Sequence, residues 1–178
     1  MIEPLTAQPV FQADRFDLRP LRRSDRGLLD MYMGDERIAK QTRAVPHPMP
    51  PGAVDAFIAR SNHDDRSEDI WALDGTKSGL AELLGVMTVN KLDRDQCEIE
   101  YWVAPAFWNT GFASEAVRTI VEANPFGAKT IFAEVFQSNG VSARVLTNAG
   151  FAYLGDAEAY SVAQDRTVQT WTYSRKID

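Results

Sequence analysis

The segment from Cys97 to Ala123 constrains the fold most, because a strand, a turn and a helix follow one another within it. From Cys97 to Val103, two alternating sets of residues give the period of a strand with two different faces. Pro105 removes a backbone donor and helps to end this strand. From Ala113 onward, apolar residues recur at helical spacing, which predicts a helix with one buried face.

The turn between this strand and helix, Trp108 to Ala113, is suited to bind an anion. Gly111 and its small neighbours let backbone N–H groups approach a ligand, and the first N–H groups of a helix have no partner within it. The positive end of the helix dipole adds to this effect, so a phosphate is the expected ligand. By itself, such a turn more often only changes the direction of the chain. It carries neither a G-x-G-x-x-G fingerprint nor a Walker lysine after Gly111.

Length and charge exclude several classes of protein. With 178 residues, 25% of them charged, the chain has the composition of an ordinary globular protein. We expect one domain over residues 1–178, with residues 1–13 as a loose lead-in. The net charge of −6 argues against a nucleic-acid partner. No apolar run is long enough for a membrane span, and no signal-peptide pattern is present, so we expect a cytoplasmic protein with no membrane partner.

The rest of the sequence predicts a single mixed α/β domain. We expect further strands at Arg15–Leu21, Asp69–Leu73, Leu83–Asn90, Thr130–Phe136, Phe151–Leu154, Ala159–Val162 and Val168–Tyr173. We expect helices from Ser24 to Tyr32, from Asp35 to Thr42, from Pro51 to about Asn62, and from Gly140 to Ala149. Gly85 lies inside one of these strands and is a common mark of a β-bulge.

A second motif, NGVSARVLTNAGF, runs from Asn139 to Phe151, directly after the strand predicted at Thr130–Phe136. Asn139 stands where a helix cap belongs, and its amide offers both donors and acceptors to a ligand. Ser142 lies in the first turn of the predicted helix, which Gly150 ends as a left-handed cap.

Together, the two motifs resemble the acetyl-CoA-dependent N-acetyltransferases of the GNAT superfamily. The resemblance covers nearly the whole chain from its RFDLRPLRRSD opening, and EIEYWVAPAFWNTGFASEA is its most specific part along with the second motif. It is greatest to the branch that acetylates the N-termini of ribosomal proteins and various small amines. It implies an α/β fold with flanking helices and a mixed sheet of six or seven strands, whose central parallel strands splay apart.

The resemblance also implies acetyl-CoA or CoA as cosubstrate, with no metal. The pyrophosphate is expected on the turn from Trp108 to Ser114, and the pantetheine arm along the backbone near Val103. The residues expected to bind the cofactor are Val103, Trp108, Asn109, Thr110, Gly111, Phe112, Ala113, Ser114, Asn139 and Ser142.

Acetyl transfer to an amine requires a base for the ammonium proton and a proton for the departing thiolate. Glu98 and Glu100 share one face of the central strand, and we favour Glu100 because it is nearer the expected splay. Either glutamate could instead line a solvated face or pair with an arginine. Ser142 is a candidate proton source, although a serine early in a helix is more often a cap or a simple CoA contact. The tyrosine that many family members use as the acid would fall at Leu146.

Three other side chains have simpler interpretations. Cys97 shares the face of Ile99 and Tyr101, which predicts a core residue and not a nucleophile. Glu115 and Arg118 are three apart on the predicted helix, so we expect a surface ion pair.

The favoured function is transfer of the acetyl group of acetyl-CoA to a primary amine, by direct attack in a ternary complex. The sequence does not decide between a protein N-terminus and a small-molecule amine as the acceptor. A non-catalytic acetyl-CoA-binding regulatory module is the alternative, because Leu146 cannot donate a proton. An interaction domain with fortuitous motifs is a third hypothesis. Homodimers are frequent among members of the family, so a homodimer stays open.

Overall fold

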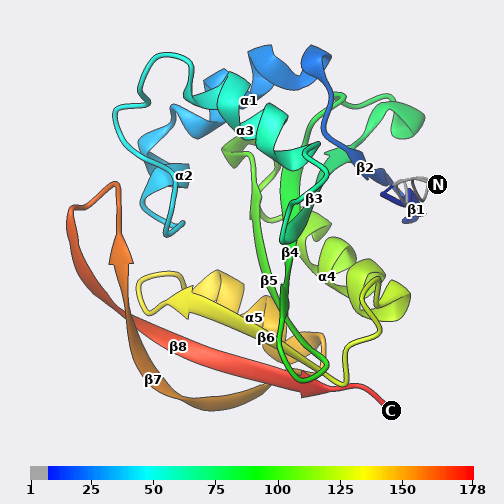
Figure 1. The fold of residues 1–178 in the computed structure, drawn as a ribbon, viewed down its shortest axis with the longest axis vertical. Coiled ribbons are helices and arrows are strands. Elements are labelled where there is room, and N and C mark those ends of the chain that lie inside the picture. The colour runs from blue at the N-terminus through cyan, green and yellow to red at the C-terminus, as the bar shows by residue number, and fades with distance from the viewer. Residues whose placement is uncertain (1–7) are drawn as a thin grey trace.

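The computed structural model describes residues 8–178. These residues form a mixed β-sheet, and helices cover both of its faces (Figure 1). The eight strands of this part lie in the order β1-β2-β3-β4-β5-β6-β8-β7. They are β1 (Phe11–Gln12), β2 (Asp17–Pro20), β3 (Glu68–Asp74), β4 (Gly85–Leu92), β5 (Gln96–Val103), β6 (Thr130–Phe136), β7 (Ala152–Ser161) and β8 (Arg166–Lys176). The helices are α1 (Arg26–Met33), α2 (Glu36–Ala39), α3 (Ala53–Ser61), α4 (Phe112–Ala123) and α5 (Gly140–Asn148). Short 3₁₀ turns lie at Arg23–Asp25, Thr76–Ser78 and Pro105–Phe107.

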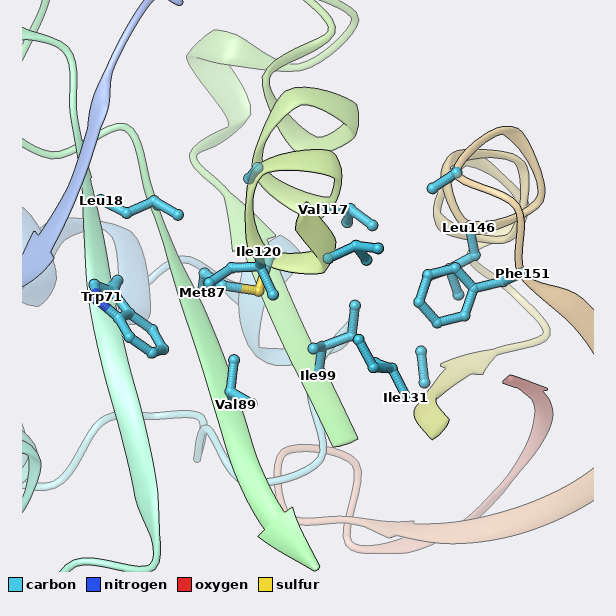
Figure 2. Close-up of a cluster of buried hydrophobic side chains, with 14 of the residues drawn as sticks. Leu18, Trp71, Met87, Val89, Ile99, Val117, Ile120, Ile131, Leu146 and Phe151 are labelled. Atoms are coloured by element: carbon cyan, nitrogen blue, oxygen red, sulfur yellow. The ribbon is translucent and has the colours of Figure 1, made fainter. Parts of the chain in front are cut away.

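The alternation of side chains along the strands builds two separate cores. In β3, Trp71 and Leu73 join the core that α4 and α5 cover, whereas Ile70 and Ala72 join the core that α1 to α3 cover. Figure 2 shows the first core from close by, with residues of α4 and α5 lying over the strands. Cys97 belongs to this core, as its place in the strand pattern predicted.

The central strands β5 and β6 run parallel but pair only over their first four residues. Their register runs from Gln96↔Thr130 to Ile99↔Ala133. Beyond that point β5 stays paired with β4, and β6 stays paired with β8. The two strands therefore diverge toward their carboxyl ends, and the expected splay is confirmed.

The sheet has more strands than the six or seven expected. Phe11 and Gln12 pair with β2, although the expected lead-in of residues 1–13 includes them. A strand of two residues is too short to show a period in the sequence, although its partner β2 follows it closely in the chain. At the other edge, β7 is one strand where two were expected, because Gly155 sits at a register irregularity that continues the strand. The first seven residues of the expected lead-in lie outside the described residues.

Gly85 is the first residue of β4, and the register with β5 runs without interruption from it to the end of β4. Just before it the backbone is irregular, because the Leu84 N–H donates to Leu73 of β3 whereas the Leu84 carbonyl accepts from Ala104, on the side of β5. A Cβ on Gly85 would lie 2.3 Å from the Trp102 carbonyl oxygen. A glycine is required here because two backbones approach each other closely.

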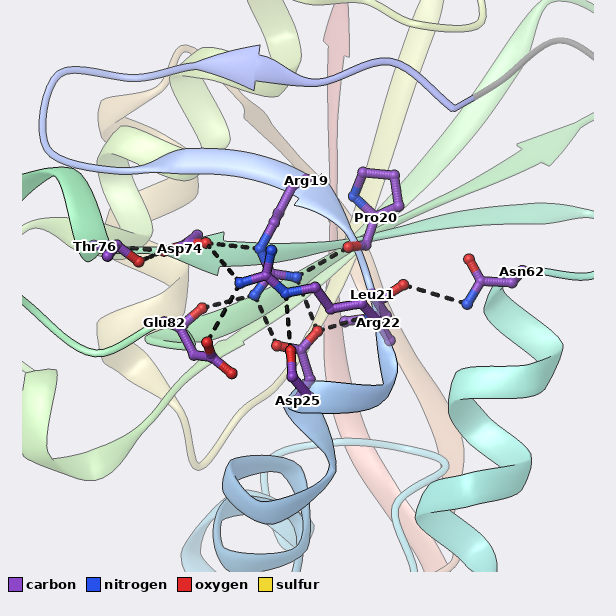
Figure 3. Close-up of polar contacts among 10 residues, drawn as sticks. Arg19, Pro20, Leu21, Arg22, Asp25, Asn62, Asp74, Thr76 and Glu82 are labelled. Atoms are coloured by element: carbon purple, nitrogen blue, oxygen red, sulfur yellow. Dashed lines mark hydrogen bonds and ion pairs between the residues drawn. The ribbon is translucent and has the colours of Figure 1, made fainter.

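The RFDLRPLRRSD opening supplies a buried ion network that fixes the start of α1 to the sheet (Figure 3). Two nitrogens of Arg19 donate to the carboxylate of Asp25 at 2.7 and 2.9 Å, and its Nε donates to Asp74 at 2.7 Å. The carbonyls of Pro20 and Glu82 accept further bonds from the same guanidinium. Asp25 is fully buried and Arg19 is 8% exposed, so each charge relies on its partners and not on water.

Replacing Arg19 should therefore be far more damaging than replacing its exposed neighbour Arg22. We expect Arg19→Leu to lower the free energy of unfolding by about 3–5 kcal/mol, because it leaves buried carboxylates without a partner. The matched change Arg22→Leu should cost less than about 1 kcal/mol, because that side chain forms its ion pairs at the surface. Urea denaturation at pH 7 measures both values, and equal small losses would contradict this account of the network.

Candidate active site

A cavity of about 270 Å³ lies between the end of β5, the turn that follows it and the first turns of α4 and α5. Every residue predicted to bind the cofactor lines this cavity: Val103, Trp108, Asn109, Thr110, Gly111, Phe112, Ala113, Ser114, Asn139 and Ser142. Side chains and backbone from two distant motifs thus meet around one hollow, which we call the turn cavity. Their role toward a ligand stays a prediction.

The turn that lines this cavity presents free backbone donors. Asn109 and Gly111 have positive φ angles of 61° and 82°, and α4 begins at the next residue. Within residues 8–178, no hydrogen bond occupies the N–H groups of Thr110, Gly111 and Phe112. Free N–H groups in a left-handed turn at a helix N-terminus are suited to bind a phosphate.

The free edge of β5 forms another wall of the turn cavity. The Ala104 N–H donates to the Leu84 carbonyl at 2.9 Å, on the side of β4. Because backbone groups alternate along a strand, those of Val103 face the opposite side, where β6 has already diverged. The Trp108 indole N–H donates to the Val103 carbonyl at 2.6 Å. The Val103 N–H is then the backbone donor that this end of β5 offers to a ligand.

A second cavity, of about 130 Å³, lies against α3, the loop after α2 and the diverging ends of β5 and β6. We call it the acidic cavity, because the three glutamates that line it outnumber its two arginines; they are Glu68, Glu100 and Glu134, against Arg43 and Arg60. The two cavities share five lining residues: Gln41, Tyr101, Trp102, Asn139 and Ser142. A group held at this junction is within reach of both cavities.

Polar groups at the junction can hold or donate protons. Asn139 caps α5, since its side chain accepts from the Ser142 N–H at 3.3 Å and donates to the Ser142 hydroxyl at 3.0 Å. The hydroxyl accepts this bond, so its own proton is available to a ligand. The Tyr101 hydroxyl donates to the Ser142 carbonyl at 3.4 Å. Burial raises the pKa of Tyr101, which therefore stays protonated at neutral pH. Leu146 lies fully buried in the core.

Glu100 and Glu98 are both paired with an arginine, which was one of the two simpler interpretations. Arg43 Nε lies 3.1 Å from Glu100, and another nitrogen bonds Glu98. The third nitrogen donates to Glu134 of β6 at 3.2 Å, and Thr170 donates to the same carboxylate at 2.9 Å. Burial alone would lower the pKa of Arg43, but the Glu100 and Glu98 carboxylates raise it, so the guanidinium stays charged.

Arg43 and Glu134 are absent from the residues that the sequence singled out. Arg43 lies in a loop without periodicity, and only the folded chain brings it to β5. A glutamate inside the otherwise apolar strand TIFAEVF was a usable signal, because buried strands rarely carry an unpaired charge.

The expected surface pair between Glu115 and Arg118 is wrong. Glu115 is 7% exposed and faces the β1–β2 hairpin, where it pairs with Arg15 at 3.4 Å. Arg118 lies on the exposed side of α4. Helical spacing places two side chains near each other, but the packing of the helix decides which of them is buried.

The sequence model described as "Acetyltransferase (GNAT) domain" matches residues 15–152. The chain belongs to the GNAT acetyltransferase family. A relative in Bacillus subtilis (strain 168), named "Uncharacterized N-acetyltransferase YoaA", is 25% identical over 93% of this chain and 96% of its own length.

Solved structures of GNAT acetyltransferases share the fold of this chain. RimL, the ribosomal L7/L12 α-N-protein acetyltransferase in complex with coenzyme A, has a TM-score of 0.81 at 14% identity, over 96% of this chain and 99% of that one. The spermidine N-acetyltransferase from Vibrio cholerae, in complex with CoA and spermine, has a TM-score of 0.76 at 15% identity, over 91% and 95%. The predicted α/β fold class, with its splayed central strands, is therefore confirmed.

Within residues 8–178, no helix is both long and apolar enough to span a membrane. The same residues contain no group of His, Cys, Asp and Glu side chains arranged to hold a metal ion.

Cys97, the single cysteine of the chain, should be chemically inert in the folded protein. It is 2% exposed, and burial raises its pKa to about 11, so the reactive thiolate is scarce at pH 8. We expect dithiobisnitrobenzoate to label it no faster than the protein unfolds, and Cys97→Ala to retain the activity of the enzyme. Rapid labelling of the folded protein at pH 8 would contradict this and reopen a covalent mechanism.

Proposed function

We propose that this GNAT protein is an N-acetyltransferase that transfers the acetyl group of acetyl-CoA to a primary amine. The junction between the two cavities carries the proposal. The turn cavity offers free N–H groups to a diphosphate and a strand edge to an extended amide chain. The acidic cavity opens to the same five residues from the other side and would receive a cationic amine. The two ligands would therefore meet in one ternary complex.

Backbone N–H groups and two side chains of the turn cavity would bind acetyl-CoA. The N–H groups of Thr110, Gly111 and Phe112 bind the diphosphate, and the pantetheine arm lies along the edge of β5 that β6 leaves free. Asn139 and Ser142 line the far wall. The thioester supplies an acetyl group that is already activated for transfer, so no covalent acetyl-enzyme is required.

Three groups would share the chemistry. Glu100, directly or through a water, accepts the proton that the ammonium form of the acceptor must lose. The amine nitrogen then forms a bond to the acetyl carbon, and the carbon–sulfur bond breaks. The Val103 N–H stabilises the negative oxygen between these events, and Ser142 gives a proton to the departing thiolate. After the attack the nitrogen loses a second proton, which passes to the Ser142 oxygen, directly or through a water, as Ser142 gives its own proton to the thiolate. The ammonium thus loses two protons, one to Glu100 and one that replaces the proton given to the thiolate, and Ser142 returns to its starting form.

The cost of deprotonation favours acceptors with a weakly basic amine. At pH 7, removing a proton costs about 1.4 kcal/mol for an α-amine and about 4.6 kcal/mol for a lysine. An α-amine therefore requires less of the base than a lysine does.

We also propose an acceptor class and an assembly for this protein. The neighbours named as ribosomal-protein and spermidine acetyltransferases support a primary amine on a protein N-terminus or a small molecule. We place the chain in the branch that acetylates ribosomal-protein N-termini and small amines. We further propose a single domain over residues 1–178 and a cytoplasmic enzyme that forms a homodimer.

A screen of amines tests the proposal, with peptides that begin with Ser or Ala and with spermidine as acceptors and release of CoA as the readout. We expect Glu100→Gln to lower kcat/KM by a factor of about 10²–10⁴, the usual contribution of a general base. Glu158→Gln, the same change on the exposed face of β7, should have no effect.

Two other outcomes would change the assignment. A larger loss in Glu98→Gln than in Glu100→Gln would move the role of base to Glu98. Tight binding of acetyl-CoA without turnover of any amine would favour the non-catalytic regulatory module.

A further inference from the structure

Arg15, just before β2, contacts the phosphate-suited turn from outside the turn cavity. Its Nη1 donates to the Thr110 carbonyl at 2.8 Å. Its guanidinium carbon lies 4.3 Å from the centre of the Phe112 ring, and its Nε lies 3.4 Å from a carboxylate oxygen of Glu115. Arg15 is not among the residues that line the turn cavity. One side chain thus contacts Thr110 in the turn and both Phe112 and Glu115 near the start of α4.

The hydrogen bond from Arg15 to the Thr110 carbonyl fixes the direction of the Gly111 N–H. In a trans peptide, the carbonyl of one residue and the N–H of the following residue point in opposite directions. Holding the Thr110 carbonyl toward Arg15 therefore directs the Gly111 N–H away from Arg15. Gly111 lines the turn cavity, whereas a Cβ on it would lie 3.3 Å from Arg15 Nη2.

Arg15 also neutralises a carboxylate next to this turn. Glu115 is buried in the first turn of α4, and its Oε2 has no hydrogen-bond partner within the described residues. An uncompensated negative charge there would repel a diphosphate at the same helix end. The ion pair with Arg15 offsets this repulsion without placing Arg15 in the cavity.

We propose that Arg15 is a positioning residue for the diphosphate of acetyl-CoA, an inference that rests on the proposed function. It fixes the peptide between Thr110 and Gly111 so that the Gly111 N–H faces the ligand. It does so from behind the turn, in contact with the turn and not with acetyl-CoA.

Calorimetry and NMR with acetyl-CoA test this role. Arg15→Ala should raise the dissociation constant of acetyl-CoA about tenfold, the usual effect of disturbing one hydrogen bond to a charged group. Selective ¹⁵N-glycine labelling resolves the 11 glycines of the chain, and Gly111→Ala identifies the Gly111 signal by its loss. At saturating acetyl-CoA, the Gly111 amide proton should move downfield in the unaltered protein and much less in Arg15→Ala.

Arg118→Ala is the matched control, because it removes the same charge from the exposed side of α4. It should leave both the affinity and the Gly111 shift unchanged. If Arg15→Ala does not fold, Arg15→Lys replaces it, since lysine keeps the charge but lacks the planar fork that meets the carbonyl and the carboxylate together. We expect the same two changes in that variant.

The remaining outcomes overturn the inference in distinguishable ways. Weaker binding with an undiminished Gly111 shift at saturation would mean that Arg15 acts through its charge or by direct contact. Unchanged affinity and shift in the Arg15 variants would remove the inference and leave the proposed function intact. Failure of the unaltered protein to bind acetyl-CoA would remove both.

Discussion

The interrupted pairing between β5 and β6 is the constraint on which the candidate site depends. Two parallel strands that stayed paired to their ends would leave no free edge at Val103 and no junction between the cavities. Each strand still forms backbone hydrogen bonds on its other side, since β5 stays paired with β4 and β6 stays paired with β8 to their ends. The cost of the splay is limited to one edge of each strand, and a ligand with amide groups can satisfy that edge.

Contacts from outside the sheet keep this opening in shape. Arg43 bridges Glu100 of β5 and Glu134 of β6, which are the first residues beyond the last paired couple. The Val162 N–H, at the turn after β7, donates to the Arg43 carbonyl and so holds the backbone of the same residue. At the end of β5, the Trp108 indole N–H donates a hydrogen bond to the Val103 carbonyl. The opening is therefore supported by the loop that carries Arg43 and by the turn between β5 and α4.

Patterns confined to one segment predicted the fold well. The alternation of Cys97 to Val103 and the helical spacing after Gly111 gave the central strand and α4, because each pattern reports which face of its element is buried. Asn139 was recognised as a cap for the same local reason.

Features that depend on a distant partner could not be predicted in this way. Gly85 is required by the carbonyl of Trp102 on the neighbouring strand, whereas β1, whose partner β2 is close in the chain, is simply too short to show a pattern. Glu115 was assigned to the wrong arginine, because its true partner lies on the β1–β2 hairpin. At the candidate site, the sequence supplied the lining of the turn cavity but not Arg43, which no local signal connects to Glu100.

A thermal melt with and without acetyl-CoA tests the central claim, that the turn before α4 forms a cosubstrate site at the splay. Ligand at a hundred times its dissociation constant adds about 2.7 kcal/mol, or roughly 5 to 11 °C for a domain of this size. We predict a shift of this order in the unaltered protein and in Gly27→Glu, which adds the same charge on the exposed surface of α1. The shift should be lost in Gly111→Glu. No shift at any concentration, or an equal shift in Gly111→Glu, would contradict the account.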